Sequence, residues 1–256
     1  MNRILDLQTH KIPPFVVNPN AETRYGSAFW DDVLEGRWER EQLSQLVELT
    51  STGKRFVDIG ASNGVYSLVM AAKGCDVIAI EPDEEQFWAL KENVALNPRF
   101  SIETLRGFVS AGPRIQLSPY AIDKSQNRVD GLPIIELKTL IQSEISTVIK
   151  VDIEGGEWQL LRDKSNRRLL TKSSDLTIFL SPHLGFFSSR YHQGPWQRVL
   201  FRFGVLRELL TLFKIAFIAD YAIYETQEIS PWQLLRKDRI FGGEGIKSHI
   251  ILKFSR

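Results

Sequence analysis

The sequence has few of the features that mark secreted, membrane-spanning or polyanion-binding proteins. Cys75 is the only cysteine, so no disulfide can form within the chain. The N-terminal residues lack the apolar core of a secretory signal, and no uncharged apolar stretch reaches the roughly 18 residues of a membrane span. Lys and Arg number 32 against 31 Asp and Glu, so no basic field would gather nucleic acid. We therefore expect a cytoplasmic protein that does not bind nucleic acid.

The composition is that of a globular protein. The chain has 256 residues, of which 43% are hydrophobic and 25% charged, enough for one sizeable core. Residues 1–20 contain three prolines and no periodicity, and we expect them to lie extended on the surface or to be mobile. Residues 29–50 have broadly helical spacing and are predicted to be a helical cover. The expected domains are an N-terminal segment with this cover, 1–52, and a main domain, 53–256.

The main domain alternates short apolar runs with segments of helical periodicity, which is the pattern of a parallel sheet covered by helices. Helices are expected at 64–73 and 84–96, and a short strand leading into a helix at 134–144. Residues 182–215 form an insertion, or lid, that contains a helix. The expected fold class is α/β. Seven runs are predicted to be strands: 55–60, 76–82, 100–105, 147–153, 176–181, 216–225 and 249–255.

A glycine turn, DIGASNG (58–64), follows the first expected strand. Gly60 and Gly64 allow a sharp turn and a close ligand, and the next helix offers unpaired N–H groups to a carboxylate or phosphate. The turn departs from the G-x-G-x-x-G of dinucleotide sites. The carboxylate of Asp58 would repel a pyrophosphate but could accept hydrogen bonds from an ammonium group. The turn thus predicts a zwitterionic ligand such as an amino acid; the alternative is that the glycines only make a tight connection.

Glu81 ends the second expected strand, 21 residues after Gly60. In nucleotide-binding α/β folds an acid at this place binds the two hydroxyl groups of a ribose. A solvated glutamate at a strand end is the simpler alternative. A binding site for an amino acid next to a binding site for a ribose matches the two parts of S-adenosylmethionine.

Acids and a histidine follow two later strands. Asp152 lies at the tip of a buried strand, where burying its carboxylate costs free energy unless a cation, a hydrogen-bond donor or a proton accompanies it. It is therefore a candidate for holding a cofactor ammonium group or a substrate hydroxyl. Glu154 and Glu157 have the alternative role of stabilising the first turn of a helix, by roughly 0.3–1 kcal/mol each. His183 follows the fifth expected strand and suits the removal of a hydroxyl proton near neutral pH. A surface role for His183, or His192 in its place, is the alternative.

Two segments, 56–97 and 147–161, carry a family pattern. They resemble the FkbM family of S-adenosylmethionine-dependent methyltransferases, in which a DxGAxxGxxS/T loop, an EP dipeptide and a later IKxDxEGxE recur in this order. The resemblance implies a Rossmann-like class I methyltransferase fold, with a seven-stranded, mostly parallel sheet whose last strand is antiparallel. Family members often end strand five with an acid, where this chain has Leu180 and Ser181. The expected cofactor-binding residues are Asp58, Gly60, Ala61, Ser62, Asn63, Gly64, Glu81, Pro82 and Asp152, and the catalytic candidates are Asp152, His183 and Glu154.

The predicted function is O-methylation, from S-adenosylmethionine, of a hydroxyl on a sugar, a polysaccharide or glycolipid precursor, or a secondary metabolite. The alternative from another class is a cofactor-binding module without catalysis. A nucleic-acid methyltransferase is disfavoured, because strand four ends in VDIEGG rather than in the Asp/Asn-Pro-Pro-aromatic turn of enzymes that methylate base amines. A divalent metal could bridge the acids and the substrate, although no spacing specifies one and no metal ligands are predicted.

The helix of the insertion has apolar residues at i, i+3, i+4 and i+7 spacing. We expect this stripe to pack on the sheet or on a partner subunit of a homo-oligomer. Because Arg198, Arg202 and Lys214 lie among the apolar residues, a weak contact with a membrane surface is the alternative. The stripe consists of Trp196, Val199, Leu200, Phe203, Leu206, Leu210 and Phe213.

Overall fold

The computed structural model describes residues 3–5, 12–19, 28–110, 131–142, 144–153, 156–173, 175–182, 195–224, 227–234 and 250–255. The chain divides into two compact units. The first unit consists of Met1–Phe108, Gly131–Pro133 and Thr147–Ile149, and the second of Val109–Asp130, Ile134–Ser146 and Lys150–Arg256. Strand β8 (Thr147–Val151) is shared between them.

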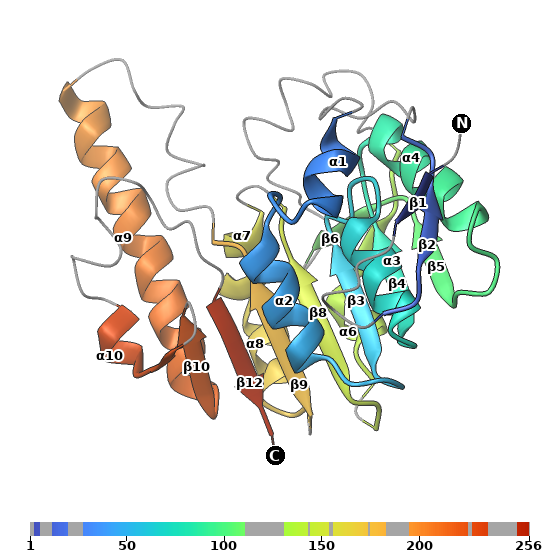
Figure 1. Ribbon diagram of the computed structural model, residues 1–256. Helices are drawn as coiled ribbons and strands as arrows, with labels where there is room; N and C mark the ends of the chain where they lie inside the picture. Colours follow the sequence, from blue (N-terminus) through green and yellow to red (C-terminus); the bar gives the residue numbers. More distant parts are fainter. Residues whose placement is uncertain are drawn as a thin grey trace. The chain divides into compact units, whose positions relative to one another are not determined.

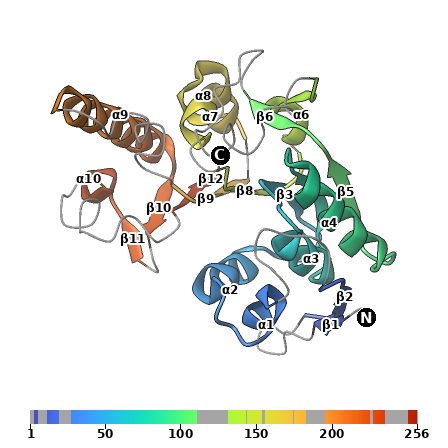
Figure 2. The same ribbon diagram turned by 90° about the horizontal axis from the view of Figure 1, so that it is seen from above.

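The first unit is built on parallel strands. Its strand order is β8-β3-β4-β5, and β4 pairs in parallel with both β3 and β5. Helix α3 packs on β3 and β4, and α2 lies next to α3 (Figure 2). Apart from their first residues, β3 and β4 are buried, as expected for strands covered on both faces. The elements are α1 (Phe29–Leu34), α2 (Arg40–Leu49), β3 (Arg55–Ile59), α3 (Val65–Ala72), β4 (Asp76–Ile80), α4 (Glu84–Ala95) and β5 (Ile102–Leu105).

The N-terminal residues form a small antiparallel pair, β1 (Arg3–Leu5) and β2 (Phe15–Val17). The expectation of an extended segment is confirmed for these strands, but the surface position is wrong for β2. Phe15 and Val17 are fully buried, because β2 packs against α4. Three residues are too few to show the alternation that would have marked a buried face.

The second unit contains an antiparallel strand at its centre. Its strand order is β11-β10-β12-β9-β8, and β12 pairs antiparallel with both β9 and β10 (Figure 1). The strands are β9 (Leu176–Leu180), β10 (Tyr221–Tyr224), β11 (Gln227–Ile229) and β12 (Ile250–Phe254); the helices are α6 (Leu137–Leu140), α7 (Glu157–Arg162), α8 (Lys164–Leu170), α9 (Pro195–Ile218) and α10 (Pro231–Leu234). A further pair, β6 (Phe108–Ser110) and β7 (Ile134–Glu136), completes the described strands.

The strand orders confirm the predicted fold. Counted along the chain, the seven predicted strands are β3, β4, β5, β8, β9, β10 and β12, so the units have the orders 4-1-2-3 and 6-7-5-4. This is a Rossmann-like α/β fold with its last strand inserted antiparallel, as expected for class I methyltransferases. The predicted number of seven is wrong, because β11 is an additional strand. It has three residues, too few for a periodic pattern.

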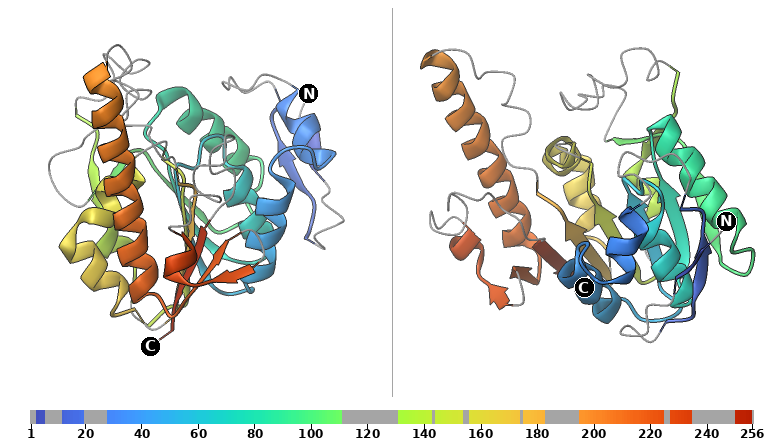
Figure 3. Two further views of the ribbon diagram at one scale, coloured as in Figure 1. Left: turned by 90° about the vertical axis from the view of Figure 1, so that its left-hand side faces the viewer. Right: turned by 45° about the horizontal axis from the view of Figure 1, so that its top comes forward.

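Helix α9, the 24-residue orange helix in Figure 3, differs from expectation in two ways. It continues to Ile218, so the strand predicted at 216–225 begins only at Tyr221. Its buried side chains include Leu209, Leu212 and Ile215, whereas Leu206 and Leu210 of the predicted stripe are 49% and 43% exposed. Leu206 and Leu210 therefore do not pack on the sheet, and contact of the stripe with a partner subunit stays a prediction. The helix is apolar on nearly every side, so spacing alone could not identify the face that packs.

Among the residues that the structure describes, no helix has both the length and the apolar character needed to cross a bilayer.

Candidate functional site

The loop from Gly60 to Gly64 connects β3 to α3 within the first unit. Both glycines are in the left-handed region, with φ of 84° and 94°. Gly64 also has no room for a side chain, because an added Cβ would lie 2.7 Å from Cδ1 of Leu90 on α4. The N–H groups of Gly60 and Ala61 donate to the carbonyl oxygen of Ile80 over 2.9 and 3.0 Å. The loop is therefore fixed to the end of β4.

Helix α3 begins directly after this loop, with Gly64 at its N-cap and no side-chain cap. The first N–H groups of a helix lack intrahelical acceptors and lie at the positive end of its dipole. All residues of α3 are buried, so packing holds this helix end in place. An uncapped helix N-terminus after a glycine loop suits a carboxylate or a phosphate.

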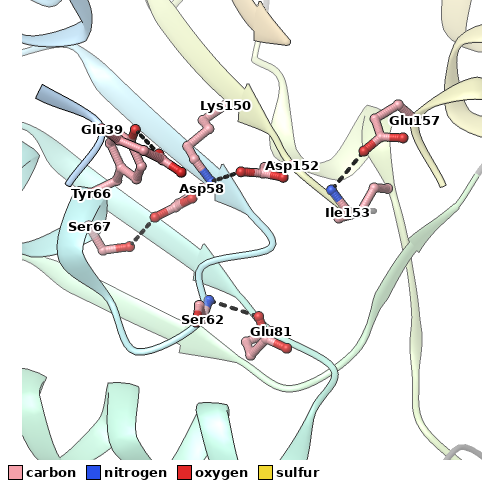
Figure 4. Close-up of polar contacts among 10 residues, drawn as sticks. All are labelled: Glu39, Asp58, Ser62, Tyr66, Ser67, Glu81, Lys150, Asp152, Ile153 and Glu157. Atoms are coloured by element: carbon pink, nitrogen blue, oxygen red, sulfur yellow. Dashed lines mark hydrogen bonds and ion pairs between the residues drawn. The ribbon is translucent and has the colours of Figure 1, made fainter. Parts of the chain in front are cut away.

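Glu81 directly follows β4 and is 5% exposed. Its Oε2 accepts the N–H of Ser62 at 2.8 Å (Figure 4), and its Oε1 accepts the N–H of Asp83 at 2.8 Å. The alternative of a solvated glutamate is therefore wrong. Ser62 has a left-handed φ of 51°, unusual for a residue with a side chain, and the bond to Glu81 stabilises it. Because a carboxylate offers about four acceptor positions, these contacts are compatible with additional bonds from hydroxyl groups.

Pro82 stands between Glu81 and the N-cap of α4. The cap is Asp83, whose Oδ1 accepts the N–H of Gln86 at 3.0 Å. The side chain of Gln86 in turn accepts the Oγ–H of Ser62 at 2.9 Å. The start of α4 and the glycine loop thus hold each other through side chains.

Asp58 is fully buried in β3. Its Oδ2 accepts the Oγ–H of Ser67, in the first turn of α3, at 2.7 Å (Figure 4). A buried carboxylate is stable only with hydrogen-bond donors or cations around it. Asp58 therefore ties β3 to α3, and its predicted role toward an ammonium group stays a prediction.

Asn63 supplies a buried donor in the loop. Asn63 is 1% exposed, and within the described part of the chain its Nδ2 has no hydrogen-bond partner. A buried donor without an acceptor costs about 1–3 kcal/mol. A ligand with a carboxylate would satisfy this amide and the N–H groups of α3 together.

Asp152 follows β8 in the second unit. Its Oδ2 lies 3.6 Å from Nζ of Lys150 (Figure 4). The Lys150 side chain is 3% exposed and that of Asp152 26% exposed, so the cation is buried while the carboxylate can still meet a ligand. Lys150 was not predicted as a site residue, although a lysine inside an apolar strand is a visible exception in the sequence.

Glu157 has a structural contact in the second unit. It is fully buried, and its Oε1 accepts the N–H of Ile153 at 3.0 Å (Figure 4). The bond therefore joins the first residue of α7 to Ile153. Two catalytic candidates, Glu154 and His183, lie outside the described residues, as do Gly155 and His192.

Ser181 is a second residue that sequence reasoning did not assign to the site. It follows β9, and its N–H donates to the carbonyl oxygen of Val151 at 2.9 Å. Its residue is nearly buried, and its Oγ has no partner among the described residues. A short polar residue at a strand end carries no distinctive sequence pattern.

The turn between α1 and α2 contacts the start of α3. The hydroxyl of Tyr66 donates to Oε2 of Glu39 at 2.6 Å (Figure 4), and the rings of Trp38 and Tyr66 lie 5.5 Å apart. Glu39 has a left-handed φ of 39° without being glycine. Strain at such a residue persists only where the surroundings hold it. The helical cover therefore contacts the first turn of α3 through Tyr66, which no sequence pattern indicated.

No group of three or more His, Cys, Asp or Glu side chains that could hold a metal occurs in the part of the chain described above.

Comparison with family models and with characterised proteins found no match to this chain. The resemblance to the FkbM family therefore stays a prediction.

Solved structures of methyltransferases are similar at low identity. The bifunctional kinase-methyltransferase WbdD is 16% identical, with a TM-score of 0.47, over 96% of this chain and 46% of its own. A proposed S-adenosylmethionine-dependent methyltransferase from Methanococcus maripaludis is 14% identical, with a TM-score of 0.43, over 91% and 94%. A proposed RNA methyltransferase from Pyrococcus horikoshii is 15% identical, with a TM-score of 0.36, over 86% and 85%. The chain spans less than half of WbdD, and likenesses this distant indicate nothing about its substrate.

Proposed function

We propose that this chain is an S-adenosylmethionine-dependent methyltransferase. The observation that carries the proposal is the bond from the Ser62 N–H to the buried carboxylate of Glu81. It fixes an acid suited to a diol beside a glycine loop that ends in an uncapped helix. A nucleotide also has an anion and a diol, but the buried carboxylate of Asp58 disfavours a pyrophosphate and favours a ligand with an ammonium group.

The residues of the first unit fit the groups of this cofactor. The Asn63 amide and the first turn of α3 would hold the methionine carboxylate, and Glu81 would accept the ribose hydroxyls. Asp58 would stabilise the ammonium group. When bound, S-adenosylmethionine supplies an electrophilic methyl group on a sulfonium.

For the acceptor we propose a hydroxyl on a sugar, a glycan or glycolipid precursor, or a secondary metabolite. The support is the resemblance of the glycine loop and the IKVDIEGGE segment to the FkbM family, together with the partly exposed carboxylate of Asp152. Asp152 would accept a hydrogen bond from the hydroxyl and take its proton as the oxygen attacks. Lys150 would hold that carboxylate at the end of β8.

Calorimetry tests the cofactor, with S-adenosylhomocysteine as the titrant and NAD as the competitor. The proposal predicts binding that NAD does not displace; displacement by NAD, or no binding, would contradict it. Release of S-adenosylhomocysteine in the presence of candidate acceptors then tests catalysis. Binding without release with any acceptor would favour the cofactor-binding module.

Asp152→Asn tests the catalytic assignment. We expect turnover to fall about 100-fold or more, the usual size of a general-base effect, while S-adenosylhomocysteine affinity is retained. The matched control is Asp175→Asn, just before the start of β9, where the carboxylate pairs with the Ser146 hydroxyl at 2.5 Å. The control should leave turnover unchanged. Equal turnover in both variants would remove Asp152 from the mechanism.

A further inference from the structure

The side chain of Asn93 connects the N-terminal strand to the glycine loop. Asn93 is fully buried on α4. Its Nδ2 donates to the carbonyl oxygen of Asn63 at 3.0 Å, and its Oδ1 accepts the N–H of Asn18 at 2.8 Å. Because one partner is a carbonyl and the other an N–H, the orientation of the amide is fixed by its surroundings. A single buried amide therefore joins two segments that are far apart in sequence.

The neighbouring Asn97 holds β2 instead, and among the described residues its side chain bonds Val16 and Asn93 rather than the loop. Its Oδ1 accepts the N–H of Val16 at 2.8 Å, and its Nδ2 donates to the Val16 carbonyl oxygen at 2.6 Å. The side chain thus pairs with β2 as a neighbouring peptide group would. Its Nδ2 also donates to the carbonyl oxygen of Asn93 at 2.7 Å. Asn93 on α4 and Asn97 just after its C-cap thus both hold the N-terminal segment, and the bond to Asn63 is made by Asn93.

The carbonyl held by Asn93 belongs to the residue that precedes Gly64, the N-cap of α3. Rotation of the peptide unit between Asn63 and Gly64 would move the Asn63 carbonyl and the Gly64 N–H, and it would break the bond from that N–H to the carbonyl oxygen of Ala61 at 2.9 Å. The bond from Asn93 to the Asn63 carbonyl opposes that rotation.

We propose that Asn93 is a positioning residue for the cofactor loop, and that docking of β2 and cofactor binding are coupled through it. The inference rests on the proposed function. Asn93 acts by holding the Asn63 carbonyl in the peptide unit that leads into α3, so that the first N–H groups of α3 face the methionine carboxylate. Coupling between two sites is reciprocal, so the cofactor must also strengthen the docking of β2.

The test compares Asn93→Leu with Asn97→Leu. Both variants remove an amide that holds β2, but only Asn93→Leu leaves the Asn63 carbonyl without its donor. We expect the dissociation constant for S-adenosylhomocysteine to rise about tenfold in Asn93→Leu, the size of an unsatisfied buried group. It should rise less than threefold in Asn97→Leu. An equal rise in both variants, or a dissociation constant for Asn93→Leu within twofold of the parent, would refute the positioning role.

Hydrogen exchange of the parent protein gives a second measurement that needs no variant. Saturating S-adenosylhomocysteine should slow amide exchange in the peptide that contains Val16 and Asn18. Unchanged exchange there, in a parent that binds, would refute the coupling and leave the proposed function standing. A parent that shows no binding in calorimetry would refute both. If Asn93→Leu does not fold, this exchange experiment decides the proposal alone.

Discussion

Replacing Glu81 with glutamine separates two functions of one carboxylate. In the protein, its two oxygens accept the N–H groups of Ser62 and Asp83, each at 2.8 Å. Glutamine has the same shape but only one acceptor oxygen, so its NH₂ group must face one of these two N–H donors. The other bond changes from charge-assisted to neutral.

The expected loss of stability follows from these contacts. A buried N–H left without an acceptor costs about 1–3 kcal/mol, and exchanging a charged acceptor for a neutral one costs roughly 1 kcal/mol more. The free energy of unfolding should therefore fall by about 2–4 kcal/mol in Glu81→Gln. Urea unfolding measures it directly, and an unchanged slope with urea would show that the unfolded state is the same.

The ligand effect is measured separately by calorimetry at a temperature where the variant is folded. Loss of the charged acceptor for two ribose hydroxyls should weaken S-adenosylhomocysteine binding by about 10- to 100-fold, or roughly 1.4–2.8 kcal/mol. A variant that is less stable but binds like the parent would remove Glu81 from the cofactor site. A variant that is as stable as the parent would refute the structural part of the reasoning.

Glu84→Gln is the matched control, at the first residue of α4. Glu84 is 38% exposed and pairs with Arg106 at 3.2 Å. Exposed ion pairs contribute about 0–1 kcal/mol, so this variant should lose less than 1 kcal/mol. Its affinity for S-adenosylhomocysteine should equal that of the parent, because no ligand role is assigned to Glu84.

Two further predictions concern other parts of the chain. Burial raises the pKa of the Cys75 thiol from 9.0 to about 11, with Lys73 and Lys54 opposing the shift, so at pH 8.5 the native thiol should react with Ellman's reagent about 100-fold more slowly than in urea. Because the native state then holds a proton that the unfolded state releases, stability should fall between pH 9 and 11; equal reaction rates in the two states would contradict this. The exposed face of α9 carries Leu210 and Phe217 beside the exposed cation Lys214, and we propose that it contacts anionic membrane surfaces. Phe217→Ser should reduce cosedimentation with phosphatidylserine vesicles, whereas a parent that stays in the supernatant, or that forms a dimer broken by the same change, would exclude the membrane contact.

The glycine loop and Glu81 could be found from the sequence because their roles depend on local conformation and short spacing. The left-handed φ values at Gly60 and Gly64 strongly favour glycine, and the strand-end acid has a fixed place in a βαβ unit. The sequence could not show that Glu81 is already bonded to Ser62, because that contact depends on how the ends of β3 and β4 are aligned.

The contacts made by asparagines were not predictable in the same way. Asn93 and Asn97 are separated from their partners Asn18 and Val16 by 75 and 81 residues, and asparagine is ordinarily a polar surface residue. The prediction of which face of α9 packs was wrong for a different reason. Its apolar residues fill several stripes, and only packing against α7 and α10 selects Leu209 and Leu212 over Leu206 and Leu210.

In the first unit, the side chains that are candidates for binding a ligand also make hydrogen bonds that stabilise the fold. Glu81 fixes the backbone of Ser62, and Asp58 fixes the first turn of α3 through Ser67. Removing either carboxylate therefore disturbs the loop as well as any ligand, and a loss of activity in such variants would not by itself assign a binding role. Asn63 differs, because its buried Nδ2 has no partner in the described part of the chain. Asn63→Ala should thus lower the affinity for the ligand with little change in the free energy of unfolding. The Asn63 amide is therefore the more selective probe of the proposed carboxylate site.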